Sequence, residues 1–268
     1  MDIGAFLDIE KKYALYTKQI NGVNYWNYSR VQIWNFEICA EKLNLQEPHQ
    51  KKKMGTGEQI KTAAVLAWNS IRRGSANIGA GVDIVFSAHE RRVKLDGVYQ
   101  CIFTGELAEC FPNSIILDVP YEYKHLRPEA NLNRYYVDYI MVLGNLYYHA
   151  HRALKTVHYR KTLALIKEQI EEPLKEILGI YRVQISLEKI YGILHKKLLT
   201  VECERRQYGR LLDLLHPKII VEVVYYGMHN MILNELAKER GICTVELQHG
   251  AMHKDHAAYQ INWKNVVP

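Results

Sequence analysis

The chain has 268 residues, of which 48% are hydrophobic and 24% are charged, and its formal net charge is +6. This length allows one large domain or two modest ones with a sizeable core, and the composition is that of an ordinary globular protein. The mild positive charge fits anionic substrates or an anionic membrane surface, whereas the lack of a dense basic block with interleaved aromatic residues argues against nucleic acid.

The N-terminal sequence has no basic segment followed by an apolar core, and no apolar run approaches the ~20 residues of a membrane-spanning helix. The five cysteines are scattered and include no CxxC pair, which is typical of free thiols in a reducing compartment. We therefore expect a cytoplasmic protein that can associate with the inner face of the plasma membrane. The 19 tyrosines, against 5 phenylalanines, suit a polar groove, including one that holds sugars. The alternative is a compositional habit of the source organism.

The first 75 residues are predicted to be helical and rich in aromatic side chains. Apolar spacing predicts helices near 3–15, 25–43 and 60–71, with a lysine-containing loop at 44–57. We interpret residues 1–75 as a helical extension that packs on a following sheet domain.

Short apolar and β-branched runs begin after residue 80. They predict strands at 82–87, 98–103 and 114–119, whereas 135–143 fits either a strand or a helix. Helices with apolar stripes dominate from about 145 to 215.

The last part of the chain predicts a βαβ unit. Residues 218–224 form an apolar strand, residues 231–237 lie on a helix that Gly241 closes, and residues 242–248 form the next strand. Strands joined in this way are parallel, with a right-handed crossover. The alternation of strands and helices predicts an α/β fold over 76–268, with a Rossmann-like, mostly parallel sheet and flanking helices.

Polar residues gather where the last predicted strand ends. Glu246 and Gln248 alternate with apolar residues along it, and His249 and Gly250 follow. Ligands of open α/β sheets bind outside the carboxyl ends of the strands, and a neutral histidine there can take a proton from a hydroxyl group. We predict His249 as a catalytic base or a donor-phosphate contact, Glu246 as its support, and Gln248 and Gly250 as substrate contacts. The alternative is a histidine that only bonds to the backbone.

A second candidate cluster, made of His89, Arg91 and Arg92, follows the predicted strand at 82–87. Arginines in such a place can hold a carboxylate or phosphate through two parallel hydrogen bonds. We predict that these three residues bind substrate, with a solvated charged loop as the alternative.

Tyr225 and Tyr226 follow the strand at 218–224. We expect them to line the same crevice as His249, because neighbouring parallel strands place their carboxyl-end loops side by side. His125 and Arg127, in a polar loop, are weaker candidates.

Three histidines, His249, His253 and His256, have spacings of four and three, which would suit a zinc site on a helix. Gly250 interrupts such a helix, and the sequence has no HExxH pattern. We therefore predict no metal site, and a metal-dependent hydrolase is the least favoured function. Cysteine or serine catalysis is not favoured either, because the sequence has no G-x-S-x-G elbow and no cysteine in a polar loop.

The segment 245–250 (VELQHG), followed by His256-Ala257-Ala258-Tyr259, resembles the E-x-Q-H-G…H-x-x-Y signature of bacterial surface-polysaccharide glycosyltransferases of the two-Rossmann (GT-B) type. The resemblance extends over roughly residues 80–260. It implies transfer of a sugar from a nucleotide-sugar to a capsule or O-antigen type polysaccharide or a lipid-linked glycan, with no cofactor in the chemistry. It also adds His256 and Tyr259 to the predicted substrate contacts.

Transferases of this type hold the acceptor mostly in the N-terminal domain and the nucleotide in a second Rossmann domain. The resemblance covers the acceptor side, and we expect a separate or missing C-terminal domain to hold the nucleotide. The isolated chain is then expected to bind the donor poorly and to be inactive or incomplete as an enzyme. The alternative function is a non-catalytic binding or scaffold module.

Overall fold

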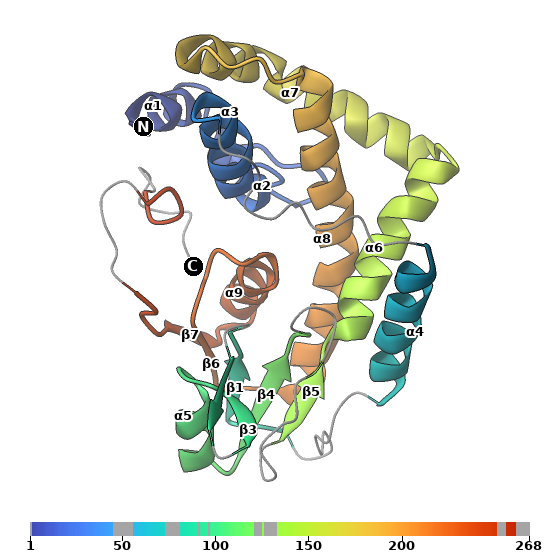
Figure 1. The fold of residues 1–268 in the computed structure, drawn as a ribbon, viewed down its shortest axis with the longest axis vertical. Coiled ribbons are helices and arrows are strands. Elements are labelled where there is room, and N and C mark those ends of the chain that lie inside the picture. The colour runs from blue at the N-terminus through green and yellow to red at the C-terminus, as the bar shows by residue number, and fades with distance from the viewer. Residues whose placement is uncertain are drawn as a thin grey trace. The chain divides into compact units, whose positions relative to one another are not determined.

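The structure is a computed structural model that describes residues 2–44, 56–72, 81–89, 92–95, 97–120, 125, 133–250 and 256–260 (Figure 1). The chain divides into two compact units. The helical unit contains Met1–Lys53, Asn145–Glu202 and Met252–Val267, and the sheet unit contains Met54–Gly144 and Cys203–Ala251.

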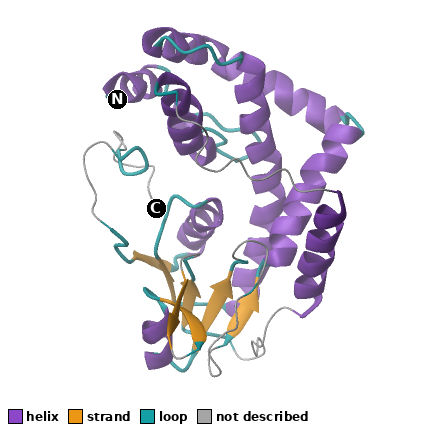
Figure 2. Cartoon of the chain, in the orientation of Figure 1, coloured by secondary structure: helices purple, strands orange, loops and turns teal. Residues whose placement is uncertain are grey.

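Five parallel strands form the sheet, in the order β5-β4-β1-β6-β7, with helices beside it (Figure 2). The strands are β1 (Ile84–Ser87), β4 (Ser114–Asp118), β5 (Arg134–Tyr136), β6 (Ile219–Glu222) and β7 (Cys243–Glu246). All neighbouring pairs are parallel. The predicted α/β class with a parallel sheet is therefore confirmed. The ambiguous segment 135–143 contains both the end of β5 and the start of a helix.

The predicted strand at 98–103 lies outside this sheet. Its residues form β3 (Val98–Cys101), which pairs antiparallel with β2 (Arg92–Leu95) in a two-stranded hairpin. Gly97, in a turn just before β3, has a φ of 84°, a conformation that favours glycine. Pairing with its immediate neighbour in the sequence therefore keeps β3 out of the parallel sheet.

The central strands are buried on both faces, which explains their continuous apolar sequences. One face carries a core cluster that contains Phe86, Ile116 and Val221 together with Ala108 of α5 (Gly105–Cys110). Full burial of each large apolar side chain contributes about 1.5–3 kcal/mol. The sheet unit also contains α4 (Thr56–Arg72) and α9 (Met228–Arg240).

The order of the five strands reverses between β1 and β6. Numbered along the chain, they lie in the order 3-2-1-4-5, which is the order of the doubly wound folds. In such sheets ligands bind outside the carboxyl ends of the strands, at the point where the order reverses. The residues that follow β1 and β6 therefore border the most favourable place for a site.

The helical unit is built from the two ends and the middle of the chain. Its elements include α1 (Gly4–Lys12), the 3-10 helix η1 (Leu15–Thr17), α2 (Asn27–Gln32), the π-helix η2 (Ile33–Cys39), α3 (Ala40–Lys42) and α7 (Val157–Tyr181). Two more helices, α6 (Asp138–Ala153) and α8 (Leu187–Leu215), run through both units. None of the helices in the described ranges has the length and apolar character needed to cross a bilayer.

This division differs from the predicted one at 75/76. Helix α4 belongs to the sheet unit, and residues 145–202, which we predicted to be part of the sheet domain, group with the N-terminal helices. Long-range contacts are the reason. The Tyr181 hydroxyl accepts a hydrogen bond from the Phe6 backbone N–H at 2.9 Å, and its ring lies edge-on to Trp34, with 5.2 Å between centroids.

Candidate functional site

Asn230, in the first turn of α9, holds together the loops at the point where the strand order reverses, which we call the switch point. Its Oδ1 accepts a hydrogen bond from Ser87 Oγ at 2.5 Å, and its Nδ2 donates to the Val224 carbonyl at 2.7 Å. One buried side chain thus links the end of β1, the loop after β6 and the start of α9.

Three aromatic rings meet at this edge. The His249 ring centroid lies 6.2 Å from that of His89, with an angle of 22° between the ring planes, and 6.2 Å from that of Tyr226. His89 also contacts Phe103 edge-on, at 5.7 Å. The loops after β1, β6 and β7 therefore bring together three of the residues that the sequence singled out, and we call His89, Tyr226 and His249 the switch-point cluster.

His249 keeps hydrogen-bonding capacity in this cluster. Its Nδ1 atom is buried and has no hydrogen-bond partner among the described residues. Such an atom calls for an explanation, and a catalytic role or a bound ligand or water is one. An imidazole that is free to bond to a ligand is what a catalytic base requires.

Glu246 secures the neighbouring loop. Its Oε1 accepts a hydrogen bond from the Tyr225 backbone N–H at 3.2 Å, and the Tyr225 and Tyr226 rings meet edge-on, with 5.7 Å between centroids. Gln248 is exposed, and its Nε2 donates to the Gly250 carbonyl at 2.9 Å. Glu246 therefore helps to set the position of Tyr226.

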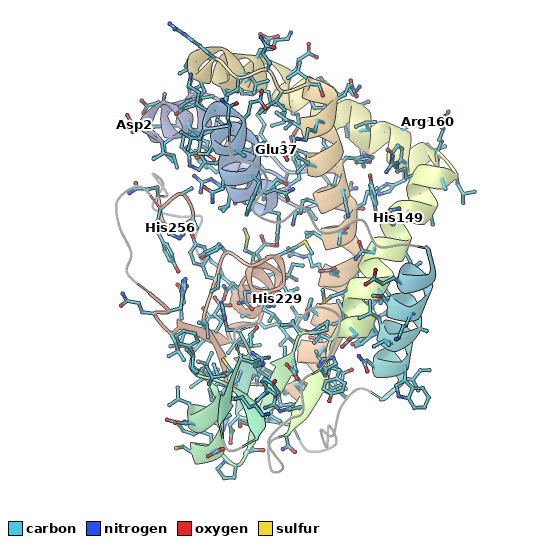
Figure 3. The ribbon with its side chains drawn as sticks, viewed as in Figure 1. Asp2, Glu37, His149, Arg160, His229 and His256 are labelled. Atoms are coloured by element: carbon cyan, nitrogen blue, oxygen red, sulfur yellow. The ribbon has the colours of Figure 1, made fainter. Side chains whose placement is uncertain are left out.

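His229, which the sequence analysis did not single out, is the second residue of α9 (Figure 3). Burial lowers its pKa to about 4, and the nearby His89 acts in the same direction. The imidazole is therefore neutral near pH 7. The signal in the sequence was its place four residues after Tyr225, close to the end of a predicted strand.

A buried carboxyl group with a raised pKa lies at the end of β6. Glu222 is 2% exposed, and its Oε1 accepts a hydrogen bond from Asn234 Nδ2 at 2.6 Å. Burial and, to a smaller extent, the charge of Glu246, its partner in the β6–β7 register, raise the pKa of Glu222 to about 8. Sequence reasoning missed this residue because its apolar neighbours gave no sign of a functional role.

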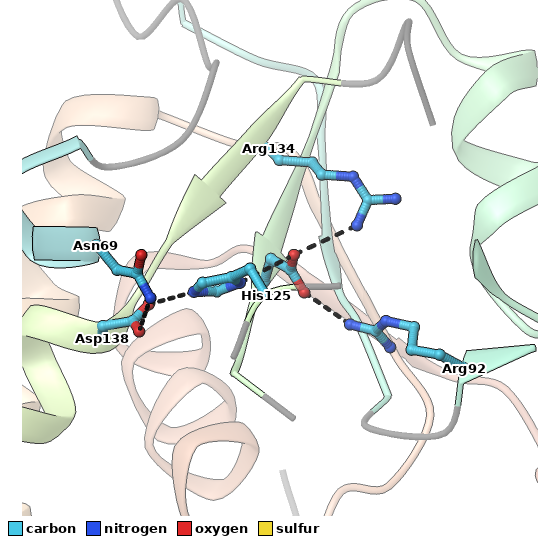
Figure 4. Close-up of polar contacts among 6 residues, drawn as sticks. Asn69, Arg92, His125, Arg134 and Asp138 are labelled. Atoms are coloured by element: carbon cyan, nitrogen blue, oxygen red, sulfur yellow. Dashed lines mark hydrogen bonds and ion pairs between the residues drawn. The ribbon is translucent and has the colours of Figure 1, made fainter. Parts of the chain in front are cut away.

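A second polar cluster lies at the ends of β4 and β5 (Figure 4). Asp118 accepts hydrogen bonds from Arg92 Nη2 at 2.7 Å, from Arg134 Nη1 at 3.3 Å and from His125 Nδ1 at 3.3 Å. The other ring nitrogen of His125 lies 2.6 Å from Asp138 Oδ2. We call these five residues the ionic cluster.

The ionic cluster holds its histidine in the charged form. Burial opposes the charge, but hydrogen bonds to Asp118 and Asp138 raise the pKa of His125 to about 9. The imidazole stacks on Tyr136, with 3.6 Å between centroids. Burial likewise opposes the charge of Asp118, but His125 and the two arginines keep its pKa below the usual value. Arg92, predicted as a substrate contact, is thus a buried partner of Asp118, with 6% of its side chain exposed.

The predicted contacts His256 and Tyr259 belong to the helical unit, whereas His249 and Gly250 belong to the sheet unit. The ring centroids of His256 and Tyr259 lie 5.0 Å apart. Arg30 holds this segment, because its Nη1 donates to the Ala257 carbonyl at 2.7 Å while its Nε pairs with Glu10 at 2.6 Å.

Three of the candidates, Arg91, Arg127 and His253, lie outside the described residues. Within the described ranges, no group of three or more His, Cys, Asp or Glu side chains is arranged to hold a metal ion. The absence of a metal from the reaction stays a prediction.

The helical unit has a separate cavity of about 410 Å³ between α7 and α8. Its lining includes Tyr148, Arg152, Tyr159, Tyr191, His195 and Lys196. Burial lowers the pKa of His195 to about 4, and the ring bonds to the Thr162 hydroxyl at 2.8 Å. This histidine is neutral and has a partner, so its role is explained by packing.

Comparison with known proteins assigns no family. The chain matches no protein-family model, no curated protein and no solved structure. We therefore infer the function from the geometry of the switch-point cluster and from the motif that contains His249.

Proposed function

We propose that this chain provides the acceptor side of a glycosyltransferase that moves a sugar from a nucleotide-sugar to a surface polysaccharide or a lipid-linked glycan. The observation that carries the proposal is the meeting of His89, Tyr226 and His249 at the carboxyl edge of a parallel sheet, where its strand order reverses. A Rossmann-like fold and the resemblance around His249 support it.

In this reaction an acceptor hydroxyl attacks the anomeric carbon of the donor sugar. A new carbon–oxygen bond forms, and the bond to the nucleoside diphosphate breaks, with its electron pair leaving on the phosphate oxygen. His249 takes the hydroxyl proton, since its imidazole has an atom free to bond. Tyr226 and His89 offer ring faces that position the acceptor sugar. His229, held neutral, leaves the edge without an additional positive charge.

Acceptor binding is the part of this function that the chain can be tested for directly. We expect oligosaccharide acceptors to shift the NMR signals of the His89 and His249 rings, and nucleotide-sugars to have little effect. Unchanged ring signals with a broad panel of acidic and neutral oligosaccharides would contradict the proposal.

Turnover is tested with nucleotide-sugar, acceptor and any separate nucleotide-binding domain together. Loss of a general base costs about 10²–10⁴-fold in rate, so His249→Gln is expected to lower turnover by this factor with little change in acceptor affinity. His149→Gln, which changes an exposed histidine of the helical unit, is the matched control. Full turnover by His249→Gln would exclude its role as base. Acceptor binding without turnover of any nucleotide-sugar would favour the binding-module alternative.

A further inference from the structure

The turn between α6 and α7, in the helical unit, presents two apolar side chains to solvent. Leu154 is 77% exposed and Val157 is 72% exposed. Single exposed apolar side chains are common on protein surfaces, but a patch with a polar rim marks an interaction site. We call residues 152–161 the helical tip.

The helical tip carries four exposed basic side chains. Arg152, Lys155, Arg160 and Lys161 are all exposed, and the sequence has no Asp or Glu from Tyr139 to Lys167. Figure 3 shows Arg160 and His149 on the two helices that meet at this turn. His158, also in the tip, pairs with Glu202 of α8 at 2.8 Å. A surface that combines exposed apolar side chains with an excess of positive charge is complementary to an anionic lipid surface.

Hydrogen bonds hold the tip in shape. The Thr156 hydroxyl caps α7 by accepting a hydrogen bond from the Tyr159 N–H at 3.1 Å, and it bonds to His151 Nδ1 at 2.7 Å. The Leu154 N–H donates to the Ala150 carbonyl at 3.0 Å. Leu154 and its neighbours are thus exposed on a fixed turn, which lowers the entropy lost on docking.

Lys155 occupies a position that favours glycine or asparagine. Its φ is 44°, in the left-handed region that side chains with a β-carbon rarely adopt. A lysine at this position contributes a charge that glycine could not supply.

We infer that the helical tip docks on an anionic lipid surface, with Leu154 and Val157 entering the headgroup region and the four basic side chains contacting lipid phosphates or carboxylates. A lipid surface is favoured over an acidic protein because the exposed apolar pair lies at the turn and the four cations lie within the same ten residues. Docking of this kind is interfacial and does not require a spanning helix. The inference does not depend on the proposed glycosyl transfer.

The test measures binding of the whole chain to vesicles by flotation and by titration. We expect binding to phosphatidylcholine vesicles that contain about one-third phosphatidylglycerol, weak binding to pure phosphatidylcholine, and loss of affinity at high salt. Each basic side chain near such a surface is worth about fivefold in affinity. Arg160→Gln with Lys161→Gln should therefore weaken binding roughly 25-fold.

The apolar contribution is tested with a matched pair of variants. Leu154→Asp should weaken binding at least about tenfold, because it removes an inserted side chain and adds a negative charge. Ile71→Asp changes a side chain of α4 that is equally exposed, at 75%, and should change affinity less than twofold.

Lys155→Asn removes one positive charge from the helical tip without disturbing the fold, so it separates an effect on vesicle binding from an effect on stability. Asparagine tolerates the left-handed conformation, so this variant should be at least as stable in urea as the wild type and still bind vesicles about fivefold more weakly. Equal binding to anionic and neutral vesicles, or equal effects of Leu154→Asp and Ile71→Asp, would overturn the inference.

Discussion

The switch-point cluster and the ionic cluster lie at the carboxyl edge of the same sheet, and both contain a histidine. In the ionic cluster, both ring nitrogens of His125 contact carboxylates. In the switch-point cluster, His249 has a buried nitrogen without a hydrogen-bond partner among the described residues. Position at the edge of the sheet therefore does not decide what a histidine does. Its hydrogen-bond partners do.

The two environments also shift pKa values in opposite directions. Two carboxylates raise the pKa of His125 to about 9, whereas burial beside another histidine lowers that of His229 to about 4. In the ionic cluster, the charged His125 stabilises the fold by pairing with Asp118 and Asp138. The second environment keeps the His229 imidazole neutral near pH 7.

Removing the shared carboxylate should have the largest effect on stability. Asp118→Ala leaves two buried arginines and His125 without this partner, and breaking a buried ion pair in this way costs about 3–5 kcal/mol. Urea unfolding measures the loss. Asp83→Ala removes the exposed partner of Lys218 and should cost less than about 1 kcal/mol. Equal losses in the two variants would show that the ionic cluster contributes no more than a surface pair.

The second prediction concerns stability at alkaline pH. Because the pKa of His125 is higher in the folded state, at about 9, than its ordinary value of about 6.5, its contribution is complete below about pH 6.5 and is lost as the pH rises through 9. The advantage of the wild type over His125→Gln should shrink by roughly 3 kcal/mol across this range. A constant difference would show that His125 is not charged in the folded protein.

Glu222 provides the control for this measurement. Its raised pKa, about 8, also makes stability fall as the pH rises, but the fall begins near its ordinary value of about 4.3. Glu222→Gln should therefore remove the loss of stability that begins at about pH 4.3, and the contribution of His125 to stability should stay unchanged.

The smallest effect is expected at acid pH, from His229. Its folded pKa of about 4 is lower than its ordinary value, so its contribution is present above about pH 6.5 and is lost as the pH falls through 4. His229 is only partly buried, and we expect its contribution to be about 1–2 kcal/mol. His229→Gln should flatten the acid limb of the stability curve, whereas His149→Gln should leave it unchanged.

Local sequence patterns predicted the strands and the edge at which polar residues gather. The apolar runs around Phe86, Ile116 and Val221 were sufficient to place three strands, because each run is buried on both faces of the sheet. The nearness of Tyr226 to His249 followed from the βαβ unit that joins their loops.

Pairing between distant residues could not be predicted in the same way. Arg92 and Asp118 are 26 positions apart, and nothing in either segment indicates the other. The grouping of 145–202 with the N-terminal helices also depends on contacts such as Tyr181 with Phe6, at a separation of 175 residues. His229 was missed because its pKa depends on burial, which no local pattern encodes.

The hydrogen bond from Arg30 to the Ala257 carbonyl has a consequence for synthesis. It joins residues 227 positions apart, within a unit assembled from the first, middle and last parts of the chain. All five strands of the sheet have been translated by Glu246, but the partner of Arg30 has not. Every strand of the sheet therefore leaves the ribosome before Ala257 does, and the buried Arg30–Glu10 pair must wait for the final contact of the helical unit.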